Sequence, residues 1–269
     1  MQELSTKPVI LKLGGSVITR KEKPSTANLK AIKRLADEIS SAKVAPLVVV
    51  HGGGSFAHPL AKRYAIKEGY KNKASQAFGF ALTHQGMVAL NKLVVDALIK
   101  HKLPAVAVSP SSCIVTKSGR IHTIMEEPLK KLLQMRFVPV LYGDAVLDSD
   151  LGFTILSGDQ LIAYLAMRLN AERIIVGIDV DGLYTADPKT NSSAKLVSHI
   201  TIEELKGMQQ QIEEAKVPDV TGGMLGKIAE LIPSIEKGIT ALIVNATKPK
   251  NVYKALKGEK VTGTLIEKG

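Results

Sequence analysis

The chain has 269 residues, and its 36 lysine and arginine residues against 25 aspartate and glutamate residues give it a formal net charge of +11. Hydrophobic residues make up 45% of the chain and charged residues 23%, values that are typical of globular proteins and exclude a largely disordered chain. The single cysteine, Cys113, excludes an intramolecular disulfide framework and a cysteine-rich zinc or iron–sulfur site.

The composition also bears on the partners of the protein. No apolar run approaches the roughly 20 residues that a membrane-spanning helix needs, and residues 1–4 lack the layout of a signal peptide. We therefore expect a soluble, cytoplasmic protein with no membrane contact. The positive charge would suit nucleic acid, but aromatic residues make up only 4%, tryptophan is absent and the lysines are scattered. We expect small anionic ligands and no nucleic-acid partner.

Apolar runs alternate with stretches of helical spacing along the whole chain. In chain order, the pattern predicts a strand at 9–13, a helix at 28–41, a strand at 46–50, a helix at 86–101, strands at 105–109 and 138–142, a β-hairpin at 146–148 and 153–156, a helix at 161–169, a strand at 173–178, a helix at 224–237 and a strand at 240–245. Because strands and helices alternate, we expect an α/β fold with a mainly parallel sheet and helices on both of its faces. We place a domain boundary near residue 165.

Glycine and polar residues follow the predicted strands, at the sheet edge where open α/β sheets bind ligands. These segments are residues 12–16 (KLGGS), 51–59 (HGGGSFAHP), 142–144 (YGD), 157–160 (SGDQ) and 179–182 (DVDG). The glycines of the first two segments would let backbone N–H groups approach two phosphates, or the two ends of one polyphosphate. The alternative is that each segment is only a tight strand-to-helix turn.

Other phosphate-binding motifs fit less well. In residues 221–228, Thr221 and Ile228 occupy the positions where a P-loop requires glycine and Ser/Thr. Residues 52–57 fit the loose dinucleotide fingerprint G-x-G-x-x-A, but the acidic residue expected after the next strand is missing. The chain has neither the H-R-D nor the D-F-G element of protein kinases.

Four segments together resemble the amino acid kinase superfamily, in the family's order and over nearly the whole chain. They are residues 12–16, residues 51–59, residues 179–188 (DVDGLYTADP) and residues 220–224 (VTGGM) with the following Lys227. Within the superfamily, His58 followed by Pro59 is most similar to the archaeal-type isopentenyl phosphate kinases, because acetylglutamate, uridylate and carbamate kinases lack a histidine there. Residues 12–21 and 157–160 resemble the same subgroup, whereas Ala57 stands where that subgroup usually has glycine.

The resemblance implies an αβα sandwich in which residues 1–165 bind a phosphate acceptor and residues 166–269 bind ATP. It also implies a homodimer, and Mg²⁺ that is held by the nucleotide phosphates with no metal site of the protein's own. The implied activity is the ATP-dependent phosphorylation of isopentenyl phosphate to isopentenyl diphosphate, in isoprenoid biosynthesis. Two alternatives stay open: another kinase of the superfamily with a nucleoside monophosphate, amino acid or phosphonate acceptor, and a nucleotide-binding regulatory module without catalysis.

The resemblance also implies roles for individual residues. Lys12 and Lys227 would contact the nucleotide phosphates, Lys21 would stabilise the transition state, and Asp159 would orient the lysines through charge-assisted hydrogen bonds. The full set of ATP-binding residues is Lys12, Gly14, Gly15, Ser16, Gly54, Asp179, Tyr184, Gly222 and Lys227. The acceptor would meet Gly53, His58 and Gly158. The competing interpretation of the three lysines is that they are solvated surface residues, and that of Asp159 is that it caps a helix.

His58 is the residue most specific to the subgroup. It precedes Pro59, a residue favoured in the first turn of a helix, and its imidazole would donate a hydrogen bond to the acceptor phosphate. Binding a dianion should favour the protonated ring. The alternative is a helix-capping or surface histidine. We expect His51 to support the end of its strand rather than to touch substrate.

Overall fold

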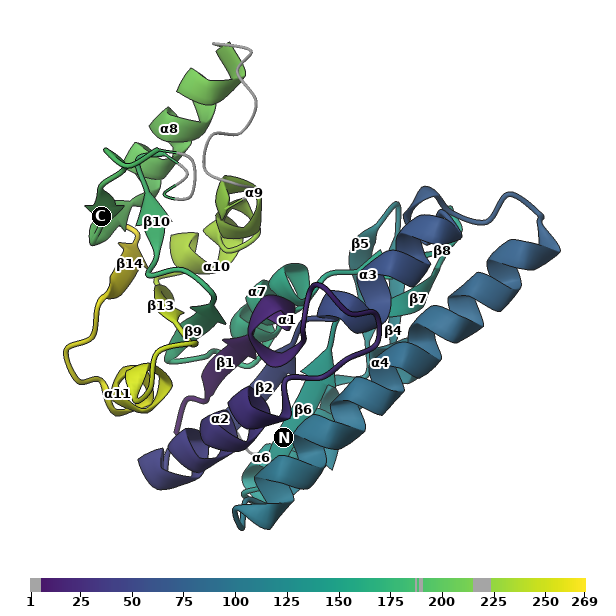
Figure 1. Cartoon of the computed structure of the whole chain (residues 1–269), viewed down its shortest axis with the longest axis horizontal. Helices are drawn as coiled ribbons and strands as arrows, with labels where there is room; N and C mark the ends of the chain where they lie inside the picture. The colour runs from purple at the N-terminus through teal and green to yellow at the C-terminus, as the bar shows by residue number, and fades with distance from the viewer. Residues whose placement is uncertain (1–5, 187, 189–190, 215–223) are drawn as a thin grey trace.

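An eight-stranded sheet forms the centre of the structure, a computed structural model that describes residues 6–186, 188, 191–214 and 224–269 (Figure 1). The strand order is β12-β14-β13-β9-β1-β2-β6-β3. The strands are β1 (Val9–Leu13), β2 (Leu47–His51), β3 (Ala105–Ala107), β6 (Val138–Tyr142), β9 (Arg173–Ile178), β12 (His199–Thr201), β13 (Thr240–Asn245) and β14 (Gly263–Glu267). Every neighbouring pair is parallel except β13 and β14, so the predicted α/β fold with a mainly parallel sheet is confirmed.

Helices cover both faces of the sheet. One face carries α2 (Leu29–Ala42), α4 (Ala74–Lys100) and α11 (Asn251–Lys257), and the other carries α6 (Glu126–Gln134), α7 (Gly158–Arg168), α8 (Ile202–Glu214), α9 (Met224–Ala229) and α10 (Ile232–Glu236). Because side chains alternate along a strand, Val9 and Leu11 of β1 pack in the first layer and Ile10 packs in the second. Lys12, the next residue on the side of Ile10, is therefore directed toward the layer of α7.

Smaller elements surround this sandwich. The predicted hairpin is confirmed as β7 (Asp144–Asp148) and β8 (Gly152–Leu156), which belong to a four-stranded sheet of order β5-β4-β7-β8. The other elements are α1 (Gly15–Ile18), α3 (Gly54–Arg63), the 3₁₀ turn η1 (Ile66–Glu68), α5 (Pro110–Cys113), β4 (Ile114–Lys117), β5 (Arg120–Ile124), β10 (Leu183–Tyr184) and β11 (Leu196–Val197). Among the described residues, no helix combines the length and the apolar character needed to cross a membrane.

Two predicted helices differ from the structure. The helix predicted to begin at residue 86 begins at Ala74 and includes Gly79. This glycine lets α4 pack on Tyr64, whose side chain would lie 2.2 Å from an added Cβ. The helix predicted at 224–237 is two helices, and Pro233 stands in the first turn of the second. The boundary placed at residue 165 falls inside α7, and the sheet continues across both halves.

A buried glutamate in α2 caps α11, which lies far away in the sequence. Glu38 is 6% exposed, and its carboxylate accepts hydrogen bonds from the backbone N–H groups of Lys250, Val252 and Tyr253 at 3.0–3.2 Å. Arg34 forms an ion pair with the same carboxylate. Since the first N–H groups of a helix have no partner within it, Glu38 satisfies donors that α11 itself cannot.

We expect Glu38→Ala to lower the free energy of unfolding by about 1–3 kcal/mol, because buried backbone donors lose their acceptor. Chemical denaturation measures the change. The matched control is Asp37→Ala, whose side chain is exposed on the same helix and which should leave stability nearly unchanged. Equal effects of the two substitutions would contradict the capping role.

Candidate active site

The two glycine loops predicted to bind phosphate lie against each other. Strands β1 and β2 are parallel neighbours, with Leu13 opposite His51, so the loops that follow them begin at the same level. A Cβ on Gly15 would lie 2.3 Å from the backbone nitrogen of Gly54, which itself has φ +48°. The side-chain hydroxyl of Thr19 joins the loops, donating to the Gly15 carbonyl at 2.7 Å and accepting from Ser55 N–H at 3.1 Å.

A cavity of about 440 Å³ opens beside these loops. Most of the predicted site residues line it: Lys12, Gly14, Gly15, Ser16, Lys21, Gly53, Gly54, His58, Gly158, Asp159, Asp179 and Lys227. Tyr184 is not among the lining residues, and its hydroxyl lies 3.5 Å from an oxygen of Asp181. Gly222 lies outside the described residues. The structure thus brings together segments from both halves of the chain.

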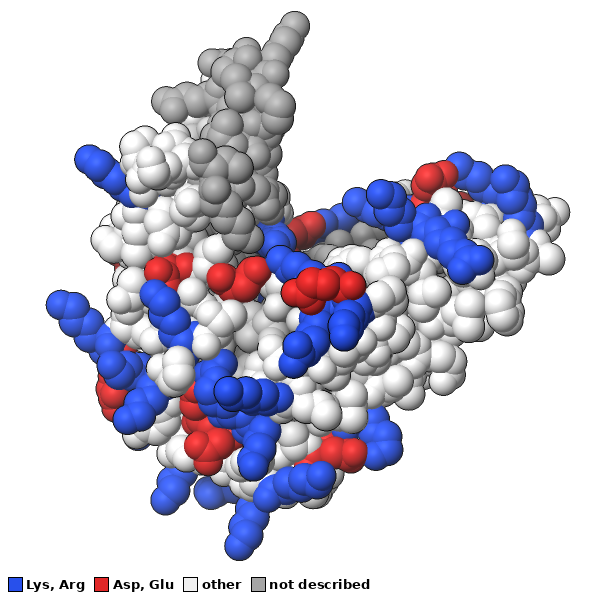
Figure 2. Space-filling model, in the orientation of Figure 1, with Lys and Arg blue, Asp and Glu red and all other residues white. Residues whose placement is uncertain are grey.

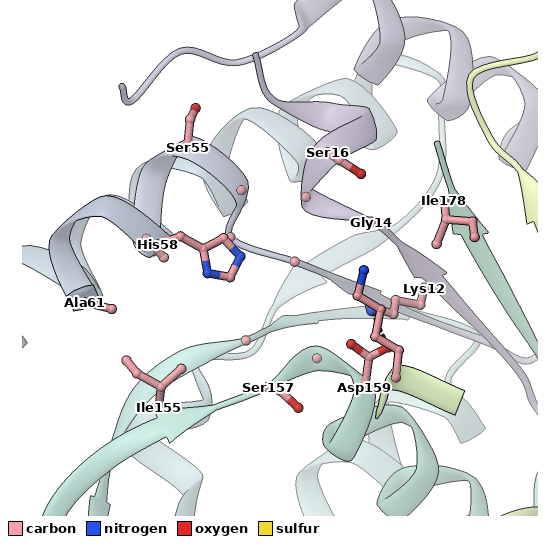
Figure 3. Close-up of a pocket in the computed structure, with 18 of the residues that line it drawn as sticks. Lys12, Gly14, Ser16, Ser55, His58, Ala61, Ile155, Ser157, Asp159 and Ile178 are labelled. Carbon is pink, nitrogen blue, oxygen red and sulfur yellow. Dashed lines mark hydrogen bonds and ion pairs between the residues drawn. The ribbon is translucent and has the colours of Figure 1, made fainter. Parts of the chain in front are cut away.

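Lys12 and Asp159 form a buried ion pair at the inner end of the cavity (Figure 3). Lys12 Nζ lies 2.5 Å from Asp159 Oδ1, and Lys12 is 5% exposed. Burial lowers the pKa of Lys12, the carboxylate of Asp159 opposes this change, and the charge of Lys227 lowers the pKa further. Ser157 caps α7 by accepting from the Gln160 N–H at 3.1 Å, which argues against the helix-cap interpretation of Asp159.

A second carboxylate, that of Asp179, holds Lys21 at the mouth of the cavity. Lys21 Nζ lies 3.0 Å from Asp179 Oδ2, and the Ser16 hydroxyl donates to Asp179 Oδ1 at 2.9 Å. Partial burial would raise the pKa of Asp179, but the hydrogen bonds from Lys21 and Ser16 outweigh burial and lower it. The Lys21 side chain is 60% exposed, so it can exchange this partner for a ligand.

The His58 imidazole projects from α3 into the cavity, on the side opposite Asp159 (Figure 3). Burial lowers its pKa, and the positive charges of Lys227 and Lys12 lower it further, so this environment favours the neutral form of the ring. Among the described residues the ring has no hydrogen-bond partner, which argues against a capping role. The cavity thus presents one unpaired imidazole close to two ammonium groups.

The expectation that Pro59 stands in the first turn of its helix is wrong. Helix α3 begins at Gly54, and Pro59 lies in its interior. A proline there leaves the carbonyl four residues earlier without its helical donor. In this structure that carbonyl, of Ser55, accepts from the Ser25 N–H at 3.0 Å, which explains why the helix tolerates the proline.

The sequence analysis missed the apolar side of the cavity. Ala57, Pro59 and Ala61 from α3 line the cavity together with Ile155 from β8. Alternation in the predicted hairpin was a signal for Ile155, but nothing local indicated that β8 would lie opposite α3. His51 is fully buried, its Nε2 lies 3.1 Å from the Asn91 amide nitrogen, and it does not line the cavity, which agrees with the support role expected for it.

Comparison with known proteins assigns this chain to a family. Residues 7–245 match the amino acid kinase family. The chain belongs to this family. It is 44% identical over 265 residues to the isopentenyl phosphate kinase of Methanothermobacter thermautotrophicus, covering 96% of this chain and 98% of the relative. It is 34% identical over 267 residues to that of Methanocaldococcus jannaschii, with coverage of 96% and 98%.

Solved structures of amino acid kinases agree with this assignment. An X-ray structure of isopentenyl phosphate kinase superposes with a TM-score of 0.85 at 42% identity, covering 96% of this chain and 99% of the other. A UMP kinase from Ureaplasma parvum, at 19% identity and a TM-score of 0.61, shares the fold. As a member of this kinase family, the chain uses ATP.

We expect Asp159→Asn to shift the alkaline limb of the pH–rate profile to lower pH. The substitution keeps the shape of the side chain but removes the charge that raises the pKa of Lys12, so the ammonium loses its proton at a lower pH. Since the protonated form is the one that attracts phosphate, activity should fall as pH rises through this lowered pKa.

The matched control is Asp96→Asn, which removes the partner of an exposed lysine, Lys92, on α4. Its profile should overlay that of the unsubstituted protein. An alkaline limb that stays in place in Asp159→Asn would show that the Lys12 ammonium does not depend on this carboxylate.

Proposed function

We propose that this protein is an ATP-dependent isopentenyl phosphate kinase, which converts isopentenyl phosphate to isopentenyl diphosphate for isoprenoid biosynthesis. The relatives that are 44% and 34% identical over nearly their full length carry that name. The observation within the site that carries the proposal is His58, an unpaired imidazole that faces Lys12 and Lys227 in one cavity.

The cavity suits an acceptor with a phosphate and a short hydrocarbon. His58 donates one ring N–H to a phosphate oxygen. Gly53 and Gly158 line the same cavity and would offer their backbone N–H groups to the same phosphate. A bound dianion stabilises the imidazolium, and so raises the pKa that burial and the lysines lower. The apolar side chains of Ala61 and Ile155 accommodate the isopentenyl group.

The nucleotide occupies the other side, at the loop of Gly14 and Ser16, with Lys12 and Lys227 on its phosphates. An oxygen of the acceptor phosphate attacks the γ-phosphorus of ATP, the bond between that phosphorus and the bridging oxygen breaks, and ADP leaves with the bond's electrons. The acceptor oxygen is already ionised at neutral pH, so the protein supplies no base. Lys21 stabilises the charge that the transferring group carries in the transition state.

Mg²⁺ would reach this site on the nucleotide. Asp159 and Asp179, the carboxylates among the described cavity residues, each pair with an ammonium group, and Mg²⁺ prefers phosphate oxygens and water when carboxylates are scarce. When bound, the ion neutralises phosphate charge. Lys12 and Lys227 would supply the remaining positive charge around the same phosphates.

We also propose a homodimer in the cytoplasm. The family resemblance supports the dimer, and α4 offers a surface for it, since Val88 and Ile99 on that helix are 37% and 53% exposed. The division of labour between residues 1–165, for the acceptor, and residues 166–269, for ATP, is part of the same proposal.

We expect Lys21→Ala to lower kcat by about ten- to a hundred-fold and to change the KM for ATP little, because a charge that acts mainly in the transition state affects turnover. Steady-state kinetics with varied ATP decide the point. Lys23→Ala, which removes an exposed lysine of the same loop, is the matched control and should behave as wild type. A normal kcat with a greatly raised KM for ATP would assign Lys21 to ground-state nucleotide binding.

We expect His58→Ala to lower kcat/KM for isopentenyl phosphate by about ten- to a hundred-fold, since the lost charge-assisted hydrogen bond is worth about 1.5–3 kcal/mol. His58→Gln should retain more activity, because its amide still offers a donor. Calorimetric affinity for a non-hydrolysable ATP analogue should stay near that of wild type in both variants. His122→Ala, at an exposed histidine of β5, is the control.

The proposed function is tested with the unsubstituted protein, ATP, and a panel of isopentenyl phosphate, nucleoside monophosphates and acidic amino acids. Turnover should be fastest with isopentenyl phosphate. If the protein prefers another acceptor, the proposed substrate is wrong but the family assignment stands. If the protein binds ATP but turns over no acceptor, a regulatory module is favoured.

A further inference from the structure

A β-hairpin from the first half of the chain reaches across to α9, the helix that carries Lys227. The hairpin consists of β4 and β5, and Arg120 begins β5 just after its turn. Arg120 Nη1 lies 2.8 Å from Glu230 Oε1. Glu230 directly follows the last residue of α9 and lies three positions after Lys227. In Figure 2 the surface is hollowed between the part formed by α3 and α4 and the part on the left of the view.

The tip of this hairpin is fixed by the residue next to Asp159. The side-chain amide of Gln160 accepts from the Ile121 N–H at 2.9 Å and donates to the Gly119 carbonyl at 3.1 Å. These two contacts hold the backbone on both sides of Arg120. Gln160 is 7% exposed, so its amide has these protein partners in place of water. The start of α7 therefore orients Lys12 through Asp159 and the hairpin through Gln160.

The far end of the connection is partly buried. Glu230 Oε2 is out of contact with solvent and has no hydrogen-bond donor among the described residues, so Arg120, on Oε1, is the charge that compensates the carboxylate there. Helix α9 is six residues long, with Met224, Leu225 and Ile228 buried beneath it. Because α9 has fewer than two turns, its apolar contacts restrict its tilt only weakly, and the ion pair at its end helps to set the direction of Lys227.

We propose that Gln160, Arg120 and Glu230 are positioning residues for Lys227, which tie the helix that carries it to the segment that orients Lys12. The proposal rests on the role of Lys227 at the nucleotide phosphates, stated above. Neither Arg120 nor Glu230 lines the cavity, so they act through α9 and not on the substrate. In-line transfer is sensitive to displacements of about 1 Å, which gives such a tie a kinetic consequence.

The test uses Arg120→Gln and Glu230→Gln in the full chain. Each should lower kcat/KM for ATP by about five- to twenty-fold, with the KM for isopentenyl phosphate unchanged and the melting temperature within about 2 °C of wild type. The charge-swapped pair, Arg120→Glu with Glu230→Arg, should recover part of the loss. The matched control is Arg168→Gln, which breaks a similarly exposed ion pair with Glu126 away from α9 and should leave kinetics unchanged.

A double-mutant cycle with Lys227→Ala separates this inference from the role of Lys227 itself. Affinity for a non-hydrolysable ATP analogue, measured by calorimetry, should fall in Lys227→Ala and in Arg120→Gln, and should fall no further when the two are combined. If Lys227→Ala binds the analogue as wild type does, the nucleotide role proposed for Lys227 is wrong. The positioning role is wrong if Lys227→Ala is impaired while Arg120→Gln and Glu230→Gln behave like the control. It is also wrong if the affinity losses of Lys227→Ala and Arg120→Gln add in the combined variant.

Discussion

The backbones of two glycine loops touch where Gly15 lies against Gly54, and the groups of the cavity take their places around that contact. The contact is possible because β1 and β2 are parallel neighbours whose ends lie at one level, and because neither residue has a Cβ. Lys12 stands just before one loop and His58 just after the other, so the two face the same space. In the proposed reaction, a donor and an acceptor phosphate bound at these adjoining loops would lie close enough to react.

The same closeness gathers positive charge: among the described residues that line the cavity, three lysines stand against two carboxylates. Burial and the charge of Lys227 lower the pKa of Lys12, and burial with both lysine charges lowers the pKa of His58. Asp159 compensates only Lys12. In the proposed reaction, anionic ligands would complete the electrostatics of the cavity, and its lysines would offset the repulsion between the two phosphates. A site organised in this way favours the state in which both ligands are bound.

Local pattern was sufficient for the strands that carry the site and for the residues that end them. The bounds of β1, β6, β9 and β13 agree with the predictions, because strands buried on both faces read as nearly continuous apolar runs. Pattern failed where a distant contact overrides it, as at Gly79, which packs on Tyr64 inside a long helix. Pattern also failed to predict the role of Gln160, because its hydrogen bonds are to a hairpin about 40 residues away in the sequence.

The ties between the two halves are of this non-local kind. The sheet is continuous, but two helices of the second half of the chain are short: α9 has six residues and α11 has seven. Short helices contribute little stability of their own, so their orientation depends on what holds their ends. Glu38 holds the start of α11 from α2, and the hairpin of Arg120 holds the end of α9. Both contacts join segments about a hundred residues or more apart. In the proposed kinase, alignment of donor and acceptor would therefore depend in part on Arg120 and Glu230, which lie outside the cavity, where no phosphate-binding motif would direct attention.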